Sequence, residues 1–87
     1  MTDVESVIRR VLKTGGYRLG SKSTIKALKN GEAKAVIVAA NCPEDVLEEI
    51  KKYDVKILTY SGTNMELGAF CGKPFSVAVM AVTEDLE

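Results

Sequence analysis

The sequence predicts an α/β fold in which a four-stranded mixed sheet carries helices on both faces. Two observations lead to this prediction. Segments with the apolar spacing of amphipathic helices alternate with short apolar runs, so that helix and strand follow one another four times within 87 residues. In addition, residues 35–40 are apolar at every position, which is typical of a central strand covered on both faces. A chain of this length is expected to form one domain over residues 1–87.

The first half of the chain is expected to contain two helices and their strands. Thr2 and Glu5 have the spacing of a capping box, and the apolar residues that follow recur at helical intervals until Gly15-Gly16. Residues 17–19 are a short strand candidate. A second helix is expected from about residue 21 to residue 30, where an Asn-Gly pair ends it.

The second half repeats the alternation. Pro43 suits the first position of a third helix, whose first turn is acidic and whose last turn is basic, as the helix dipole favours. Residues 55–60 are expected to form the third strand. Residues 63–66 have the capping-box pattern again and begin a short helix that ends near Gly72, and residues 75–82 form the final strand.

Composition disfavours several functional classes. No apolar run approaches the ~20 residues that cross a bilayer, and the acidic N-terminus lacks a signal-peptide core, so we expect a cytoplasmic protein without a membrane partner. Cys42 and Cys71 lie in no metal-binding spacing and are expected to be free buried thiols. The chain has no histidine, which removes the common nucleophile pairs and the commonest metal ligand. We therefore predict no catalytic residue, no metal and no cofactor.

The clearest functional feature is the helix that begins at Gly20-Ser21. A helix N-terminus presents unpaired backbone N–H groups and a partial positive charge, which attract phosphate. Lys22, Lys26 and Lys29 lie at i, i+4 and i+7 and therefore share one face of this helix. Lysines at this spacing also line ordinary solvated faces, so the stripe by itself leaves both interpretations open.

The distribution of charge favours a polyanionic ligand. Residues 9–34 contain eight basic residues and one acidic residue, a local charge of +7, although the net charge of the whole chain is zero. From residue 35 onward nine carboxylates face four lysines. Such asymmetry between the two parts of a chain indicates a polyanion on the N-terminal side, most simply nucleic acid.

Several single residues permit two interpretations. The stretch before Ser23 is superficially similar to a P-loop, but Ser21 separates the glycine from Lys22, so a nucleotide triphosphatase is disfavoured. Asn41 follows the buried strand as either a turn residue or a ligand contact. Phe75 is either a core residue or a ring exposed for stacking on a base. Cys71 has no imidazole partner, which disfavours a catalytic thiol.

Three separated segments, in matching order and spanning nearly the whole chain, resemble the L-thirty-e ribosomal proteins of archaea and eukaryotes, which belong to the L-seven-Ae kink-turn-binding superfamily. The helix start carries Lys22-Ser23, where the L-seven-Ae branch carries Asn-Glu, and this favours the L-thirty-e branch. The segments are Gly16-Tyr17-Arg18-Leu19-Gly20-Ser21-Lys22-Ser23-Thr24-Ile25-Lys26, Ala39-Ala40-Asn41-Cys42-Pro43, and Asn64-Met65-Glu66-Leu67-Gly68 with Cys71-Gly72-Lys73-Pro74-Phe75.

The resemblance implies a three-layer α/β/α sandwich that binds a kink-turn or similar G·A-rich internal loop of ribosomal RNA. It implies that Leu19 and Phe75 contact bases, that Gly20 allows close backbone approach, that Lys22 and Asn41 bind the internal loop, and that Lys26 binds phosphates. Irregular RNA loops expose base edges and faces that an A-form helix conceals. The implied RNA-binding residues are Leu19, Gly20, Ser21, Lys22, Ser23, Lys26, Asn41, Lys73 and Phe75.

The sequence therefore predicts a non-enzymatic, RNA-binding constituent of the large ribosomal subunit. Its partners would be ribosomal RNA and other large-subunit components, and the free protein would be monomeric. Glu44-Asp45 are acidic where the family tends to be basic, so no RNA contact is assigned to the third helix. Two alternatives remain open: a kink-turn-binding protein outside the ribosome, and a regulatory module that binds a small phosphometabolite at the Gly20 helix start.

Overall fold

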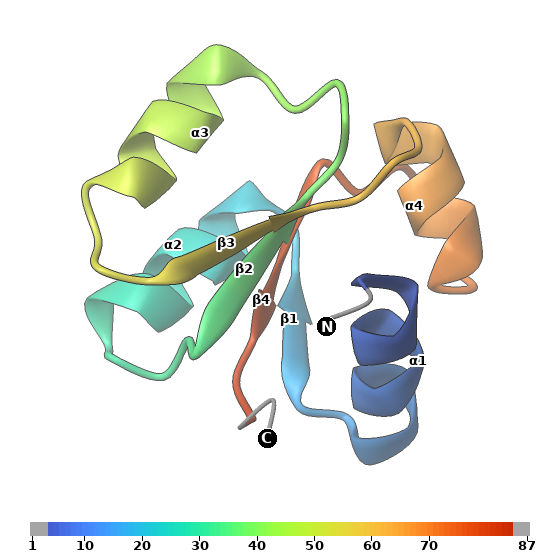
Figure 1. Ribbon diagram of the computed structural model, residues 1–87, viewed down its shortest axis with the longest axis horizontal. Helices are drawn as coiled ribbons and strands as arrows, with labels where there is room; N and C mark the ends of the chain where they lie inside the picture. Colours follow the sequence, from blue (N-terminus) through green and yellow to red (C-terminus); the bar gives the residue numbers. More distant parts are fainter. Residues whose placement is uncertain (1–3, 85–87) are drawn as a thin grey trace.

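The computed structural model describes residues 4–84, in which helix and strand alternate as predicted (Figure 1). No helix within these residues is long and apolar enough to cross a membrane. In chain order the elements are α1 (Val4–Thr14), β1 (Tyr17–Leu19), α2 (Ser21–Lys29), β2 (Ala35–Val38), α3 (Glu44–Lys51), β3 (Lys56–Thr59), α4 (Asn64–Phe70) and β4 (Val79–Val82).

The four strands form one mixed sheet in the order β1-β4-β2-β3. β4 runs antiparallel to both of its neighbours, β1 and β2, whereas β2 and β3 are parallel. Strands β1, β2 and β3 consequently end at the same end of the sheet, where β4 begins. We call this the Gly20 end, because Gly20 directly follows β1 there.

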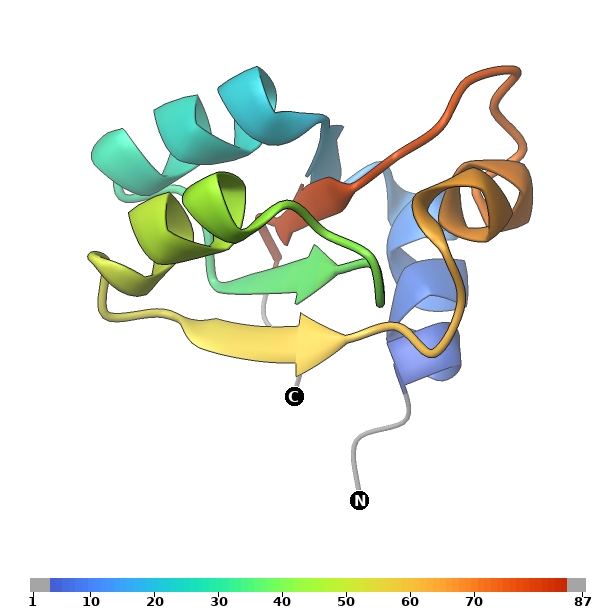
Figure 2. The same ribbon diagram turned by 90° about the horizontal axis from the view of Figure 1, so that it is seen from above.

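Helices cover both faces of the sheet, which confirms the predicted three-layer α/β/α sandwich (Figure 2). Ala35 and Ile37 of β2 pack into a cluster with residues of α1 and α4, whereas Val36 and Val38 pack with residues of α2 and α3. All four are at most 3% exposed. Burying an aliphatic side chain of the size of Val or Ile contributes about 1.5–3 kcal/mol, so this strand is a principal source of stability.

The final strand is shorter than predicted, because β4 begins at Val79 and not at Phe75. The Val77 N–H donates to the Asn64 carbonyl at 2.9 Å, and the Ala39 N–H donates to the Ala78 carbonyl at 2.8 Å. Residues 75–78 therefore connect α4 to the sheet as a loop. Of these residues Val77 is buried, whereas Phe75 is exposed. The third strand is also shorter than predicted, by one residue at each end.

Three of the four predicted helix starts lie within the described residues, and α2 begins at Ser21 as predicted. We predicted Pro43 at the first position of α3, but it occupies the N-cap, and the helix begins one residue later at Glu44. The Thr63 hydroxyl accepts a hydrogen bond from the Glu66 N–H at 3.3 Å, which confirms the cap of α4. The predicted pairing of Thr2 with Glu5 lies partly outside the described residues.

Both cysteines are free thiols. Cys71 is buried as predicted, whereas Cys42 is only half-buried, so that part of the prediction was wrong. Burial raises the pKa of both thiols, with a further rise at Cys42 from Asp45 and an opposing effect of Lys73 at Cys71. Both groups are therefore protonated at neutral pH.

Candidate nucleic-acid interface

The start of α2 is shaped by Gly20. This residue has φ of 92°, a conformation that L side chains rarely adopt, and a Cβ built on it would meet no atom within 4 Å. Its N–H donates to the Val79 carbonyl at 3.0 Å, and its carbonyl accepts from the Thr24 N–H at 3.0 Å. Having no side chain, Gly20 cannot cap α2, so the first-turn amides remain available to an external anion.

Lysines extend from this helix start along α2. Lys22 and Lys26 are both exposed. Lys26 and Ser23 line a hollow of about 380 Å³ between α2 and β1, together with Arg18 and Asn30. One carboxylate, Glu32, also lines it, so cations exceed anions there by one. A phosphate in this hollow would meet cations and hydrogen-bond donors from two elements.

Asn41 is joined to Asn64, the first residue of α4. The Asn41 Oδ1 atom accepts from the Asn64 N–H at 2.8 Å, and the Asn41 Nδ2 group donates to Asn64 Oδ1 at 3.2 Å. Asn41 thus acts as a turn residue and also presents amide groups at the Gly20 end, since each amide nitrogen carries two donors. Asn41 is therefore a turn residue in the structure, and its position also remains compatible with a ligand contact.

Phe75 is an exposed ring, with 56% of its surface accessible, and not a core residue. It lines a hollow on α4 of about 230 Å³, together with Met65 and the half-buried Lys73. The loop packs so closely on α4 that a Cβ at Gly68 would overlap the Phe75 carbonyl oxygen. The absence of a side chain at Gly68 therefore allows the backbone of the Phe75 loop to approach α4 closely.

Hydrogen bonds bring these parts to one end of the sheet. Val77, Ala78 and Val79 are consecutive, and their backbone groups bond to Asn64, Ala39 and Gly20 respectively. The start of α4, the end of β2 and the start of α2 are thereby attached to the same short segment, just after the Phe75 loop (Figure 2).

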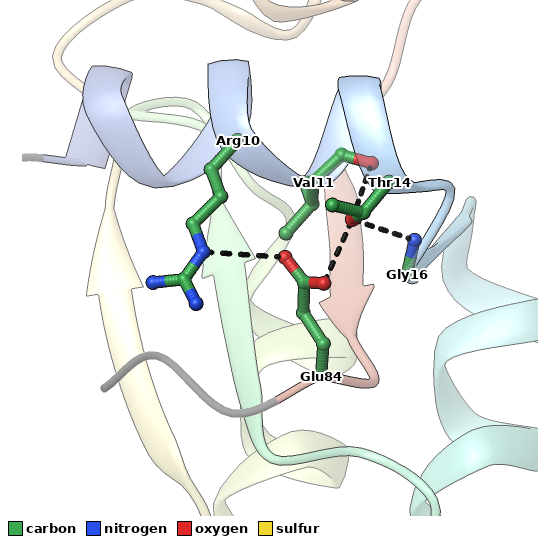
Figure 3. Close-up of polar contacts among 5 residues, drawn as sticks. All are labelled: Arg10, Val11, Thr14, Gly16 and Glu84. Atoms are coloured by element: carbon green, nitrogen blue, oxygen red, sulfur yellow. Dashed lines mark hydrogen bonds and ion pairs between the residues drawn. The ribbon is translucent and has the colours of Figure 1, made fainter.

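The basic residues between 9 and 34 do not form one face. Those of α1 lie on the α1/α4 side of the sheet, and those of α2 lie on the opposite side. Arg9 stacks over the Phe70 ring at 5.5 Å from its centroid, and the Nε atom of Arg10 lies 3.8 Å from Glu84 Oε1 (Figure 3). The contiguous charge in the sequence therefore becomes two separate basic surfaces.

Leu19 differs from the other predicted site residues. Its side chain is half-buried and packs against the core cluster under α1 and α4, next to Met80. Sequence reasoning did not single out Arg18, Asn30 or Asn64. Arg18 lies in a three-residue strand and carries no functional signal of its own. Asn30 and Asn64 were already explained as residues at helix boundaries.

The three-layer sandwich and the polar, partly basic end of its sheet define a small α/β binding protein. The chain belongs to the Ribosomal protein L7Ae/L30e/S12e/Gadd45 family, whose sequence profile matches residues 2–87.

Two relatives are each called large ribosomal subunit protein eL30. That of Archaeoglobus fulgidus is 78% identical over 86 residues, which are 99% of this chain and 100% of that protein. That of Methanopyrus kandleri is 50% identical and covers 100% of this chain and 84% of its own. A solved structure titled Giardia lamblia 15.5kD RNA binding protein has a TM-score of 0.73 at 15% identity, covering 99% of this chain and 79% of that one, which shows the same fold.

Proposed function

We propose that the protein is a structural constituent of the large ribosomal subunit that binds a kink-turn-like internal loop of ribosomal RNA at the Gly20 end of the sheet. The full-length similarity to archaeal large-subunit proteins eL30 supports the ribosomal role. The observation that supports the RNA-binding site is that the α2 start, the Asn41–Asn64 pair and the segment just after the exposed Phe75 meet at one end of the sheet.

Phosphates of the loop would bind at α2. The first-turn amides and the Lys22 ammonium group supply donors and positive charge at its N-terminus. Lys26 and Ser23, next to Arg18, supply a second phosphate position one turn further along. These contacts are independent of base sequence and would set the position of the RNA on the protein.

Bases of the loop would bind between α2 and the Phe75 loop. Phe75 offers an aromatic face to an unstacked base, and Lys73 lies in the same hollow. The amides of Asn41 and Asn64 can donate to base edges, and the exposed part of Leu19 can pack against a base. Gly20 lets the backbone approach closely, and Ser21 follows it with a half-buried hydroxyl side chain.

The proposed role requires no catalysis. The chain contains no histidine, and the site works by hydrogen bonding, stacking and charge alone. We place the protein in the cytoplasm, on ribosomes, with other large-subunit components as neighbours and as a monomer when free. Its presence in purified large subunits would distinguish this role from that of a kink-turn protein outside the ribosome.

Binding of a kink-turn RNA, compared with a straight duplex of equal length at two salt concentrations, tests the proposal. The kink-turn should bind more tightly, and Lys22→Ala should lower its affinity and reduce the salt slope by about one unit. Lys51→Ala in the last turn of α3 is the matched control, since it removes an equally exposed lysine elsewhere. Equal affinity for both RNAs would contradict the site, and binding of neither would favour the phosphometabolite module.

A further inference from the structure

The outward face of α1 forms a second basic surface. Its five exposed residues recur at helical spacing, and together they line a hollow of about 370 Å³. We call them the α1 surface: Ser6, Arg9, Arg10, Lys13 and Thr14. Three are cationic, two carry hydroxyl groups, and none is acidic or apolar.

Neighbouring residues orient both guanidinium groups of this surface. The Arg9 group stacks on the Phe70 ring, and Arg10 pairs with Glu84. Glu84 is in turn fixed by the Thr14 hydroxyl, which donates to its Oε2 atom at 2.7 Å (Figure 3). Taken together, the three cations of the α1 surface and the single carboxylate of Glu84 carry a net positive charge. Orienting the side chains beforehand lowers the entropic cost of binding.

The α1 surface is separate from the phosphate positions proposed on α2. The two helices cover opposite faces of the sheet (Figure 2). Thr14 and Glu84 lie beyond the start of β1 and the end of β4, which is the opposite end of the sheet from Gly20. An RNA loop bound at the Gly20 end and along α2 would leave this part of α1 accessible.

We infer that the α1 surface binds the phosphate backbone of a second, double-stranded RNA segment, so that the protein joins two parts of the folded RNA. This inference rests on the proposed function. Cations and hydroxyl groups are the usual partners of phosphate, and such contacts carry no base preference. A protein partner is disfavoured because the apolar residues Val7, Ile8 and Val11 of α1 are buried against the sheet, and the five residues of the α1 surface offer no apolar anchor.

The test uses protein already saturated with a kink-turn RNA that has short stems. A labelled blunt RNA duplex of about 16 base pairs is then titrated at low salt, and its anisotropy reports binding. We expect a ternary complex. The double variant Arg9→Gln with Lys13→Gln should weaken duplex binding about tenfold and reduce its salt slope by about two units. Affinity for the short kink-turn RNA should stay within about twofold.

A matched variant removes the same charge elsewhere. Lys51→Gln with Lys56→Gln lies on α3 and β3 and should leave duplex binding nearly unchanged. Equal weakening by both double variants would refute the inference, because net charge would then explain the binding, and so would exclusion of the duplex from the loaded parent protein. Lys13→Gln alone should change binding in the same direction if the Arg9 variant unfolds. Failure of the proposed function would appear separately, as loss of the kink-turn preference in the free parent protein.

Discussion

Gly68 offers a test in which helix propensity and packing predict opposite signs. It lies inside α4, where alanine is favoured over glycine by about 1 kcal/mol in an exposed helix. A Cβ added at Gly68 would overlap the Phe75 carbonyl oxygen and would lie 3.2 Å from the Ser76 Cα atom. Gly68→Ala therefore requires the Phe75 loop to move.

The expected magnitude follows from this overlap. Real Cβ contacts essentially never fall below 3.0 Å, so the backbone of the loop must move away from α4. The Lys73 N–H donates to the Gly68 carbonyl at 2.9 Å, so the loop is tied to the same residue that displaces it. Overpacking of this kind costs about 1–3 kcal/mol. We expect a cost near the upper end of that range, from which the gain in helix propensity of about 1 kcal/mol is subtracted. The free energy of unfolding should therefore fall by about 1–2 kcal/mol.

Urea and thermal unfolding followed by circular dichroism measure this loss, which corresponds to a fall in Tm of about 4–16 °C. Ala69→Gly is the matched control, because Ala69 is the exposed neighbour in the same helix and should lose only about the propensity term. Kink-turn affinity should also fall in Gly68→Ala, because Phe75 moves. A Gly68→Ala protein as stable as the parent would refute the packing argument.

Three further outcomes are expected. Phe75→Ala should weaken kink-turn binding by about 1–3 kcal/mol in a gel-shift titration and leave Tm nearly unchanged, because the ring is exposed. Thr63→Ala should lower the urea-unfolding free energy by about 1 kcal/mol, because the Glu66 N–H loses its acceptor. The pKa of Tyr60 is raised above 10.0, mainly by burial and further by the carboxylates of Glu5 and Glu66. Because the unfolded chain loses this proton at a lower pH than the folded protein, the free energy of unfolding should fall as pH rises past about 10.

Each outcome has a control. Met65→Ala removes an exposed side chain from the same hollow as Phe75 and should affect binding less, because it removes no aromatic ring. Thr63→Ser keeps the hydroxyl acceptor and should keep the cap. Tyr60→Phe removes the titrating group, so the decline above pH 10 should become shallower. An unfolded Phe75→Ala, an unaffected Thr63→Ala or an unchanged pH profile in Tyr60→Phe would contradict the respective argument.

Local patterns predicted the elements, but not how the strands meet. The apolar run at 35–38 is buried on both faces because β2 lies between β4 and β3, and its composition reports that environment directly. Nothing in residues 17–19 or 79–82 indicates that these strands pair with each other. Their pairing depends on contacts across more than sixty residues of sequence, from Tyr17 to Val82. The sheet order therefore became visible only in three dimensions.

The candidate site shows the same division. Gly20, Asn41 and Phe75 could be selected because their segments resemble a known family. In the structure, Gly20 and Asn64, the partner of Asn41, bond to residues 77–79, which follow Phe75 closely in the chain. Asn64 could not be selected from the sequence, because its position at the start of a predicted helix already explained it. The basic residues between 9 and 34 suggested one charged surface, because they are close in sequence. In the structure they form two surfaces, since α1 and α2 lie on opposite faces of the sheet.

The zero net charge of the chain also bears on how RNA would be recognised. The exposed carboxylates Glu44 and Asp45 begin α3, which packs beside α2 on the same face of the sheet. Charges are screened beyond about 8 Å at physiological ionic strength, so attraction by α2 and repulsion by α3 act only near contact. An RNA loop that reaches Asn41 is then favoured on the α2 side and disfavoured on the α3 side. In the proposed complex, orientation and loop shape would therefore contribute more to selectivity than long-range attraction, which is weak for a protein of zero net charge.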